Sequence, residues 1–345
     1  MVFGVLGSGT WATAIAKMLT DNGHHIHWLF RDQESVDHLR TRGHNPKYLS
    51  SVHFDQRLLT LHSDVNTFMS NASVIILAVP SAYLEDYCTG ISSQAFRHKK
   101  VVSAIKGILP TDNRLVNDYL QQEFNVNSTD FFTIMGPCHA EEVAAEKLSY
   151  LTFSGSDTDT CKQIASQFAG NYLRTVVNND VYGVQYAAVL KNIYALGAGI
   201  AHGLEYGDNF QSVLIANCAD EMAGFLKKAG IQHIDVGVHD PEDPVTQLKH
   251  TSYAASVYLG DLLVTCYSLY SRNRTFGNMI GKGYSVRTAQ LEMNMVAEGY
   301  NASRSIYNIN QKLGAELPIA TSIYRILWEN VHPRAGFKEI ETVLV

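Results

Sequence analysis

The chain has 345 residues, which corresponds to about two domains of roughly 150 residues each and excludes a disulfide-dense miniprotein. Hydrophobic residues make up 46% and charged residues 17%, below the roughly 25% of ordinary soluble domains, so much of the chain must be buried. With 27 Lys and Arg against 33 Asp and Glu, the net charge of −6 argues against the basic surface that nucleic-acid binding requires.

The cysteines and histidines argue against a bound metal. The five cysteines are scattered and form no CxxC pair, a pattern typical of a reducing compartment. None of the 14 histidines lies in an HxxxH or HExxH pattern. No apolar run reaches the roughly 18 residues of a membrane span. We therefore expect a cytoplasmic protein with no metal site and no membrane span.

Short apolar runs alternate with helical patterns in the first half of the chain. The runs predicted as strands are Val2–Leu6, His25–Phe30, Ser73–Val79, Val101–Ile105, Phe131–Met135, Tyr150–Phe153 and Leu173–Val177. This alternation predicts an α/β domain over residues 1–180, with a largely parallel sheet covered by helices.

A glycine motif, Gly7-x-Gly9-x-x-Ala12, follows the first predicted strand and opens a helix. Gly7 permits the tight turn, Gly9 lets the backbone approach a pyrophosphate, and Ala12 allows close packing of helix and strand. The backbone amides near Thr10 and Trp11 would then point at the phosphates. In this context the motif predicts dinucleotide binding, and an ordinary glycine-rich turn is the alternative.

The second predicted strand is followed by Arg31 and Asp32. At this place an acid binds the ribose 2′-hydroxyl of NAD, whereas an arginine accepts the 2′-phosphate of NADP. Because the arginine comes first, the sequence favours NADP and leaves NAD open. A solvated surface charge is the alternative interpretation of Arg31.

Lys106 and Gly136 directly follow two later predicted strands and so lie at their carboxyl ends. This is the edge at which open parallel sheets bind ligands. Lys106 is therefore predicted to contact the substrate or the nicotinamide, with a solvated lysine as the alternative. The helix that begins after Gly136 offers free backbone amides to an anion or a carbonyl. Ordinary helix capping would explain this second feature equally.

Helical periodicity replaces the strand pattern beyond about Asp180, which predicts an all-α domain over residues 181–345. The stretch Gln232–His250 is predicted as a loop because its prolines and acids interrupt any helical stripe. The segments predicted as helices are Val184–His202, Gln211–Ala229, Tyr253–Leu269, Val286–Leu313 and Ile319–Asn330.

Lys191 lies in an apolar stripe of its predicted helix. Burial of an unpaired ammonium is costly, so a lysine in such a stripe is a candidate for proton transfer. Asp261, an acid within another apolar segment, is its candidate partner. The alternatives are a lysine that extends to solvent at the helix edge and an aspartate that caps a helix after Gly260.

Ser271, Arg272, Asn273, Arg274 and Lys282 lie within a dozen residues of an otherwise acidic chain. Arginine offers a bidentate fork to a phosphate, and serine and asparagine add neutral donors. The cluster predicts a phosphate site, and a solvated charged loop is the alternative.

An ordered set of motifs spans Val2 to about Asn330: GSGTWATA, LAVPS, IKGI, GPCHAEEVA, LKNIYALGAGIAHGLEYGDN, GDLLVTCYSLYSRNRTFG, VAEGY and ELPIATSIYRIL. Together they resemble the NAD(P)-dependent glycerol-3-phosphate dehydrogenases of the bacterial type. The resemblance implies a Rossmann-like α/β domain followed by an all-α domain of the 6-phosphogluconate dehydrogenase kind. It also implies interconversion of dihydroxyacetone phosphate and sn-glycerol 3-phosphate with NAD or NADP, which supplies glycerol 3-phosphate for phospholipid synthesis.

The resemblance also implies roles for individual residues. Lys191 would be the proton donor and acceptor, Asp261 would orient it, and Lys106 completes the catalytic set. Cofactor contacts would be Thr10, Trp11, Arg31, Lys106, Ala140, Arg272, Val296 and Glu298, together with the motif residues Gly7, Gly9 and Ala12. Substrate contacts would be Lys106, Gly136, Cys138, Lys191, Asp261, Ser271, Arg272 and Asn273.

Three residues depart from the family pattern. Cys138 stands where the family usually has Ser or Thr, His139 where it has Phe, and Asn217 where many members carry Arg. A thiol is a weaker hydrogen-bond donor than a hydroxyl, so the substrate contact of Cys138 differs most from the pattern.

Two other functions fit part of the sequence. A related Rossmann hydroxy-acid dehydrogenase would share the glycine turn and Lys191–Asn192, and would not need the cationic cluster. A non-catalytic dinucleotide sensor would bind cofactor without turnover, and the retained Lys106, Lys191 and Asp261 argue against it. The apolar helical half leaves room for the interface of a homodimer.

Overall fold

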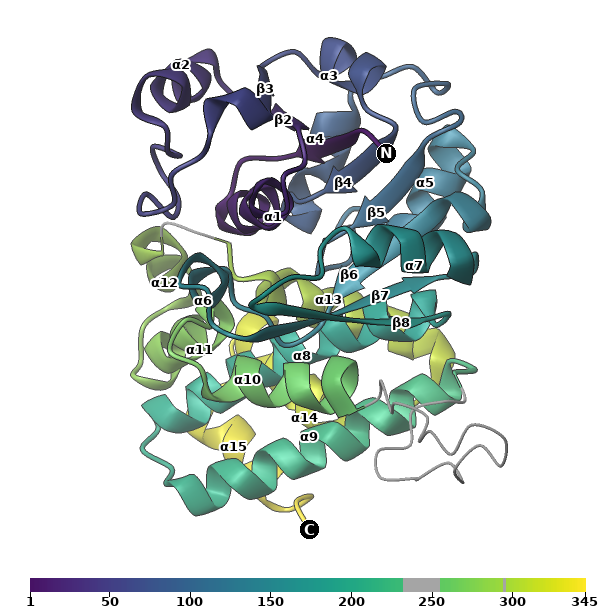
Figure 1. Cartoon of the computed structure of the whole chain (residues 1–345). Coiled ribbons are helices and arrows are strands. Elements are labelled where there is room, and N and C mark those ends of the chain that lie inside the picture. The colour runs from purple at the N-terminus through teal and green to yellow at the C-terminus, as the bar shows by residue number, and fades with distance from the viewer. Residues whose placement is uncertain (232–254, 294–295) are drawn as a thin grey trace, which may run out of the picture. The chain divides into compact units, whose positions relative to one another are not determined.

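The computed structural model describes residues 1–231, 255–293 and 296–345 (Figure 1). The chain divides into two compact units. The first comprises Met1–Leu109 and Arg114–Val181, and the second comprises Pro110–Asn113 and Tyr182–Val345.

The first unit contains one eight-stranded sheet in the order β3-β2-β1-β4-β5-β6-β7-β8. Every neighbouring pair is parallel except β6 and β7, which are antiparallel. The strands are β1 (Phe3–Leu6), β2 (Ile26–Leu29), β3 (Leu59–His62), β4 (Val74–Leu77), β5 (Lys100–Ser103), β6 (Phe131–Met135), β7 (Ser149–Gly155) and β8 (Leu173–Asn178). The predicted fold class, with a largely parallel sheet, is confirmed.

Helices cover both faces of this sheet, as the alternation along β4 shows. Ile76 packs into one apolar cluster with Val5 and Trp28, whereas Ile75 and Leu77 pack into a second cluster. Successive side chains of a strand point to opposite faces, so both faces are buried. The helices of this unit are α1 (Thr10–Asp21), α2 (Gln33–Arg42), α3 (Val65–Asn71), α4 (Leu84–Cys88), α5 (Val116–Phe124), α6 (Ala140–Ala144) and α7 (Thr158–Ser166), with short 3₁₀ turns at Gln56–Leu58, Ser81–Tyr83 and Ser128–Asp130.

The sequence prediction missed β3, which pairs with β2 at the edge of the sheet. This strand has only four residues, and two of them, Thr60 and His62, are polar. Its apolar pattern is therefore too short to distinguish it from a loop, and its strand conformation depends on hydrogen bonds to the more apolar β2.

The described residues of the second unit form helices and no strands. They are α8 (Val181–Gly203), α9 (Asp208–Lys228), α10 (Asp261–Tyr267), α11 (Arg272–Gly281), α12 (Val286–Glu292), α13 (Glu298–Leu313), α14 (Pro318–Trp328) and α15 (Pro333–Glu341), with a π-helical segment η4 (Ala255–Gly260). The predicted all-α character is confirmed for these residues. None of the described helices is both long and apolar enough to cross a membrane.

The structure corrects three details of this half. The single helix predicted over Val286–Leu313 is two helices, α12 and α13. The cationic segment, for which a solvated charged loop is the alternative interpretation, begins helix α11, because the hydroxyl of Ser271 caps it by accepting a hydrogen bond from the backbone N–H of Arg274. Helix α15 was not predicted. The predicted loop Gln232–His250 lies outside the described residues.

Helices α8 and α11 cross at a distance that only glycine allows. A Cβ atom on Gly277 would lie 2.0 Å from the carbonyl oxygen of Leu196, and one on Gly199 would lie 2.1 Å from that of Arg274. Real side chains do not approach a backbone so closely, so the two glycines let the helix backbones touch. This crossing holds the start of α11 against the helix that carries Lys191.

Candidate active site

The glycine motif of the first unit forms the predicted turn between β1 and α1. Gly7 adopts a φ of +113°, and a Cβ there would lie 2.7 Å from the carbonyl oxygen of Ala78. The indole of Trp28 donates a hydrogen bond of 2.8 Å to the carbonyl oxygen of Gly7. By contrast, no atom lies within 4 Å of a Cβ built on Gly9, and Ala12 is fully buried. The backbone at Gly9 is therefore open to a ligand.

Lys106, Trp11 and Gly136 meet at the carboxyl edge of the sheet, although they follow three different strands. The ammonium of Lys106 lies 5.4 Å from the centre of the Trp11 ring and donates to the carbonyl oxygen of Gly136 at 3.2 Å. Gly136 has a φ of +118°, which favours glycine. The aromatic face and the carbonyl oxygen together hold the cation in place.

The other residues predicted as contacts at this edge, Thr10, Cys138 and Ala140, are buried. Thr10 is the buried first residue of α1, and Ala140 is the buried first residue of α6. Cys138 and Ala140 pack in the same apolar cluster, and Trp11 packs against it. Cys138 is 6% exposed, so its thiol is buried in this cluster.

Arg31 is exposed just past the end of β2, as the sequence predicts. Asp32 has a different role, because it caps helix α2 by accepting a hydrogen bond of 2.7 Å from the backbone N–H of Ser35. Hydrogen bonds from the side chain of Ser35 and from its backbone N–H lower the pKa of Asp32.

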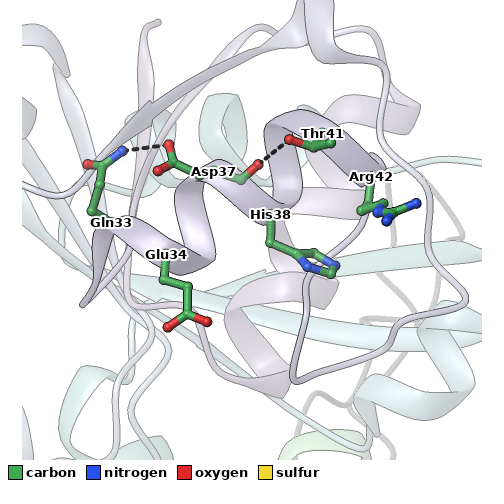
Figure 2. Close-up of a pocket in the computed structure, with 6 residues that line it drawn as sticks. All are labelled: Gln33, Glu34, Asp37, His38, Thr41 and Arg42. Atoms are coloured by element: carbon green, nitrogen blue, oxygen red, sulfur yellow. Dashed lines mark hydrogen bonds between the residues drawn. The ribbon is translucent and has the colours of Figure 1, made fainter.

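A shallow hollow nearby contains none of the predicted site residues. Figure 2 shows that its lining comes from one helix, α2. The lining residues are Gln33, Glu34, Asp37, His38, Thr41 and Arg42. A single polar helix surface does not enclose a ligand, so we assign no function to this hollow.

In the second unit, Lys191 and Asp261 form a buried ion pair. Lys191 lies on α8 and is 3% exposed, and Asp261 begins α10 and is 1% exposed. The ammonium Nζ of Lys191 contacts the carboxylate Oδ1 of Asp261 directly. Lys191 therefore does not extend to solvent, and Asp261 is more than a helix cap. Burying such a pair costs desolvation free energy, and removing one partner would strongly destabilise the fold because it leaves the other charge buried without compensation.

Two positive charges act on the thiol of Cys266, which lies between one and two turns after Asp261 on α10. Burial raises the pKa of the Cys266 thiol to about 12, and the charges of Lys191 and Arg274 oppose this shift. The thiol therefore stays neutral. Lys191 and Arg274 thus both act on the same thiol although they lie on different helices.

Asn192, Asn273 and Gly299 join three helices beside this ion pair. The side-chain amide of Asn273 donates to the Oδ1 atom of Asn192 at 2.9 Å, and the Oδ1 atom of Asn273 accepts from the backbone N–H of Gly299 at 2.9 Å. A Cβ on Gly299 would lie 2.4 Å from the carbonyl oxygen of Asn192. The asparagine at the start of α11 is therefore fixed next to the helix that carries Lys191.

The other predicted residues of this unit surround the start of α11. Ser271 is its buried capping residue and Arg272 its half-buried first residue. Val296 and Glu298 lie just before and at the start of α13, next to Gly299. Lys282, which the sequence placed in the cationic cluster, lies exposed at the opposite end of α11, about 15 Å away by helix rise. It does not belong to the cluster.

A second buried acid, Glu221 on α9, has no local sequence pattern that indicates it. Its carboxylate accepts hydrogen bonds from the hydroxyl of Tyr194 at 3.1 Å and from the backbone N–H groups of Ile319 at 2.7 Å and Ala320 at 2.9 Å. Burial raises the pKa of Glu221 to about 7, and these three donors oppose the shift. Because Tyr194 lies one turn after Lys191, Glu221 fixes that part of α8 against α14.

Comparison with known proteins identifies the two halves of the chain. The family model for the N-terminus of NAD-dependent glycerol-3-phosphate dehydrogenase matches residues 3–161, and the model for its C-terminus matches residues 180–338. A glycerol-3-phosphate dehydrogenase [NAD(P)+] of Staphylococcus aureus is 31% identical over 340 residues, which cover 97% of this chain and 96% of that protein. One of Streptococcus suis is 30% identical over 340 residues, covering 98% and 95%.

The structure is also similar to a crystal structure of glycerol-3-phosphate dehydrogenase from Coxiella burnetii. The TM-score is 0.85 at 26% sequence identity, and the match covers 98% of each chain.

Proposed function

The chain belongs to the NAD-dependent glycerol-3-phosphate dehydrogenase family, and we propose that it interconverts dihydroxyacetone phosphate and sn-glycerol 3-phosphate with NAD or NADP. The buried pair of Lys191 and Asp261 carries this proposal, because it gives the chain a shielded proton donor of the kind that ketone reduction needs. The product would supply phospholipid synthesis.

The residues of the first unit fit a dinucleotide. Gly9 leaves its backbone open, and helix α1 begins with no side-chain cap at Gly9, so the backbone N–H groups of its first turn suit a pyrophosphate. Gly7 and Ala12 make the tight turn that brings these amides to the edge of the sheet. When bound, the nicotinamide supplies the hydride that adds to the C2 carbonyl carbon of the ketone.

We assign the proton step to Lys191. As the carbon–oxygen π bond breaks and its electrons move to oxygen, the Nζ proton of Lys191 transfers to that oxygen and completes the alcohol. The carboxylate of Asp261 orients the ammonium before transfer and accepts its hydrogen bond. In the reverse direction the neutral amine takes the hydroxyl proton.

We assign the phosphate to the start of α11. Arg272 offers a planar fork, and Ser271 and Asn273 add neutral donors at a helix N-terminus, where the dipole favours an anion. Contacts far from the reacting carbon supply binding energy that orients the ketone. Lys106, Gly136 and Cys138 of the first unit are the other proposed substrate contacts.

The activity is tested by following NADPH absorbance when the protein meets dihydroxyacetone phosphate. Unphosphorylated dihydroxyacetone, a 2-keto acid and NADH are run in parallel. The proposal expects rapid oxidation only with the phosphorylated ketone. Oxidation with the keto acid instead would identify a hydroxy-acid dehydrogenase, and cofactor binding without any oxidation would identify a sensor.

Three broader expectations belong to this proposal. We propose residues 1–180 as the cofactor domain and residues 181–345 as the substrate domain. A cytoplasmic location and a homodimer also stay predictions. Cell fractionation tests the location, and light scattering of the purified protein tests the assembly.

A further inference from the structure

Helix α1 carries a buried cation, Lys17, that the proposed mechanism does not use. It is 8% exposed, although lysine is almost never buried unless it is paired. Its Nζ atom lies 2.5 Å from Oδ2 of Asp21, one turn further along α1, and 3.0 Å from Oε1 of Glu146. Burial opposes the charge, but the hydrogen bonds to these two acids outweigh it and raise the pKa of Lys17.

Tyr172 completes this cluster. It directly precedes β8, and the centre of its ring lies 5.3 Å from the ammonium of Lys17. Its hydroxyl donates a hydrogen bond of 2.6 Å to Oδ2 of Asp21. The cluster therefore joins three segments, namely α1, the turn after α6 and the start of β8. We refer to Lys17, Asp21, Glu146 and Tyr172 as the Lys17 clamp.

The backbone of Glu146 has an unusual conformation. Its φ of +54° lies in the left-handed region, which favours glycine and which other residues adopt at a cost. The residue ends the turn after α6, and its backbone N–H donates to the carbonyl oxygen of Val143 at 3.0 Å. A glycine would fit this turn but could not reach Lys17. The ion pair thus accounts for a glutamate at this position.

Helices α1 and α6 otherwise meet through small apolar side chains. Ala16 of α1 belongs to the same apolar cluster as Ala140 and Val143 of α6. Apolar contacts are not directional, so they bring the helices together without fixing how far one slides along the other. The ion pair of Lys17 and Glu146 adds a contact of defined length between α1 and the end of α6.

We propose that Lys17 is a positioning residue that acts through Glu146: it holds α6, and with it the segment Gly136–Ala140, in the place that ketone binding requires. The inference rests on the proposed function, because this segment contains two of the proposed substrate contacts. Without the clamp the segment samples several positions, and the apparent affinity for the ketone falls with the fraction that is competent to bind. Lys191 lies on another element, so proton transfer to the bound ketone is unaffected.

Steady-state kinetics at saturating NADPH tests this separation of binding from chemistry. A competent fraction of about one tenth in Lys17→Met would raise the KM for dihydroxyacetone phosphate about 10-fold and leave kcat within about 2-fold. Lys17→Arg keeps the cation, and its KM should lie within about 3-fold of the wild type. An unchanged KM in Lys17→Met, or a loss confined to kcat, would overturn the proposal.

A second variant changes the more exposed partner, because loss of the buried lysine can also impair folding. The side chain of Glu146 is 62% exposed, and asparagine tolerates a positive φ. Glu146→Asn should raise the KM about 10-fold, and the double variant with Lys17→Met should raise it no further, since both changes remove the same contact. An unchanged KM in Glu146→Asn, or multiplied effects in the double variant, would overturn the proposal.

Two controls separate positioning from stability. Asp21→Asn removes the partner of Lys17 within α1 and keeps the link to α6, so the KM should stay within about 2-fold. Lys100→Met breaks an ion pair of 2.7 Å with Asp130 at the amino ends of β5 and β6, and should also leave the KM unchanged. If either control raises the KM as much as Glu146→Asn does, the effect is general loosening and the proposal is wrong.

Amide hydrogen exchange makes the test independent of turnover. In the full-length protein without ligands, Glu146→Asn should speed exchange over residues 136–145 by about 10-fold and leave the buried strand β4 unchanged. Unchanged exchange over residues 136–145 would overturn the proposal. A wild type that does not reduce dihydroxyacetone phosphate would refute the proposed function alone, and the exchange measurement would still decide whether the clamp holds α6.

Discussion

The ammonium of Lys191 and the carboxylate of Asp261 contact each other in a part of the second unit that solvent barely reaches, since the two residues are 3% and 1% exposed. A pair of charges at such a depth rarely stabilises a fold more than well-packed apolar residues would. We therefore attribute the pair to catalysis rather than to stabilisation of the fold. Mutation can separate its effect on turnover from its effect on the free energy of unfolding.

The first prediction therefore compares single and double variants of this pair. Asp261→Asn leaves a buried ammonium without its partner and should lower the free energy of unfolding by about 3–5 kcal/mol. The double variant Lys191→Met, Asp261→Leu removes both charges and should recover most of that loss, yet show no turnover. Urea unfolding and the turnover assay measure the two effects. A double variant as unstable as Asp261→Asn would mean that the pair itself holds the fold together.

The second prediction concerns the close crossing of α8 and α11. Gly277→Ala would place a Cβ 2.0 Å from the carbonyl oxygen of Leu196, so one helix must move. We expect a loss of about 3 kcal/mol in unfolding free energy and a higher KM for dihydroxyacetone phosphate, because Asn273 moves with α11. Gly224→Ala on α9 is the control, since no atom lies within 4 Å of its Cβ. The free energy of unfolding of that variant should be unchanged or higher by up to about 1 kcal/mol. An equal loss of unfolding free energy in both variants would show that the close approach of α8 and α11 does not cause it.

The third prediction follows from the raised pKa of Glu221. Burial raises this pKa from 4.5 to about 7, so between these values the folded protein holds a proton that the unfolded chain has released. The stability that Glu221 contributes is complete below about pH 4.5 and is lost as the pH rises to about 7, by about 3 kcal/mol in total. Glu221→Gln should remove this slope from urea unfolding measured between pH 4.5 and 8. Asp220→Asn, an exposed neighbour on α9, should keep it.

A slope that survives in Glu221→Gln would assign the pH dependence to other groups. A slope of the opposite sign in the wild-type minus variant difference would contradict the raised pKa of this carboxyl.

The fourth prediction concerns the aromatic face beneath Lys106. Trp11→Leu removes the ring that lies 5.4 Å from the ammonium and should raise the KM for dihydroxyacetone phosphate by about 2- to 30-fold. Trp11→Phe keeps an aromatic face and should recover much of the loss. Steady-state kinetics with both substrates separates this effect from cofactor binding. If the two variants raise the KM equally, the ring does not act through its aromatic face.

Much of this architecture can be predicted from local patterns. The strands that end near Gly7, Lys106 and Gly136 are short apolar runs, and their carboxyl ends meet at the edge that topology requires. The pairing of Lys191 with Asp261 is also predictable, because each is a lone charge in an apolar stripe and neither is stable there by itself.

Other features depend on contacts between segments distant in sequence, and no local pattern indicates them. Glu221 occupies an ordinary position of an amphipathic helix, and its function as a cap becomes visible only when Ile319 and Ala320 are placed beside it. Asn45 lies in a polar loop, and its burial depends on the carbonyl oxygen of Ser8. Strand β3 exists because β2 offers it hydrogen bonds.

The most direct test is a single-turnover measurement on Lys191→Met with NADPH and dihydroxyacetone phosphate, with the wild type alongside. Methionine has a similar length and no proton to transfer. We expect a rate at least about 100-fold lower, with NADPH affinity unchanged, because general acid catalysis contributes at least that factor. A rate within a few-fold of the wild type would show that Lys191 does not deliver the proton, and the proposed mechanism would be wrong.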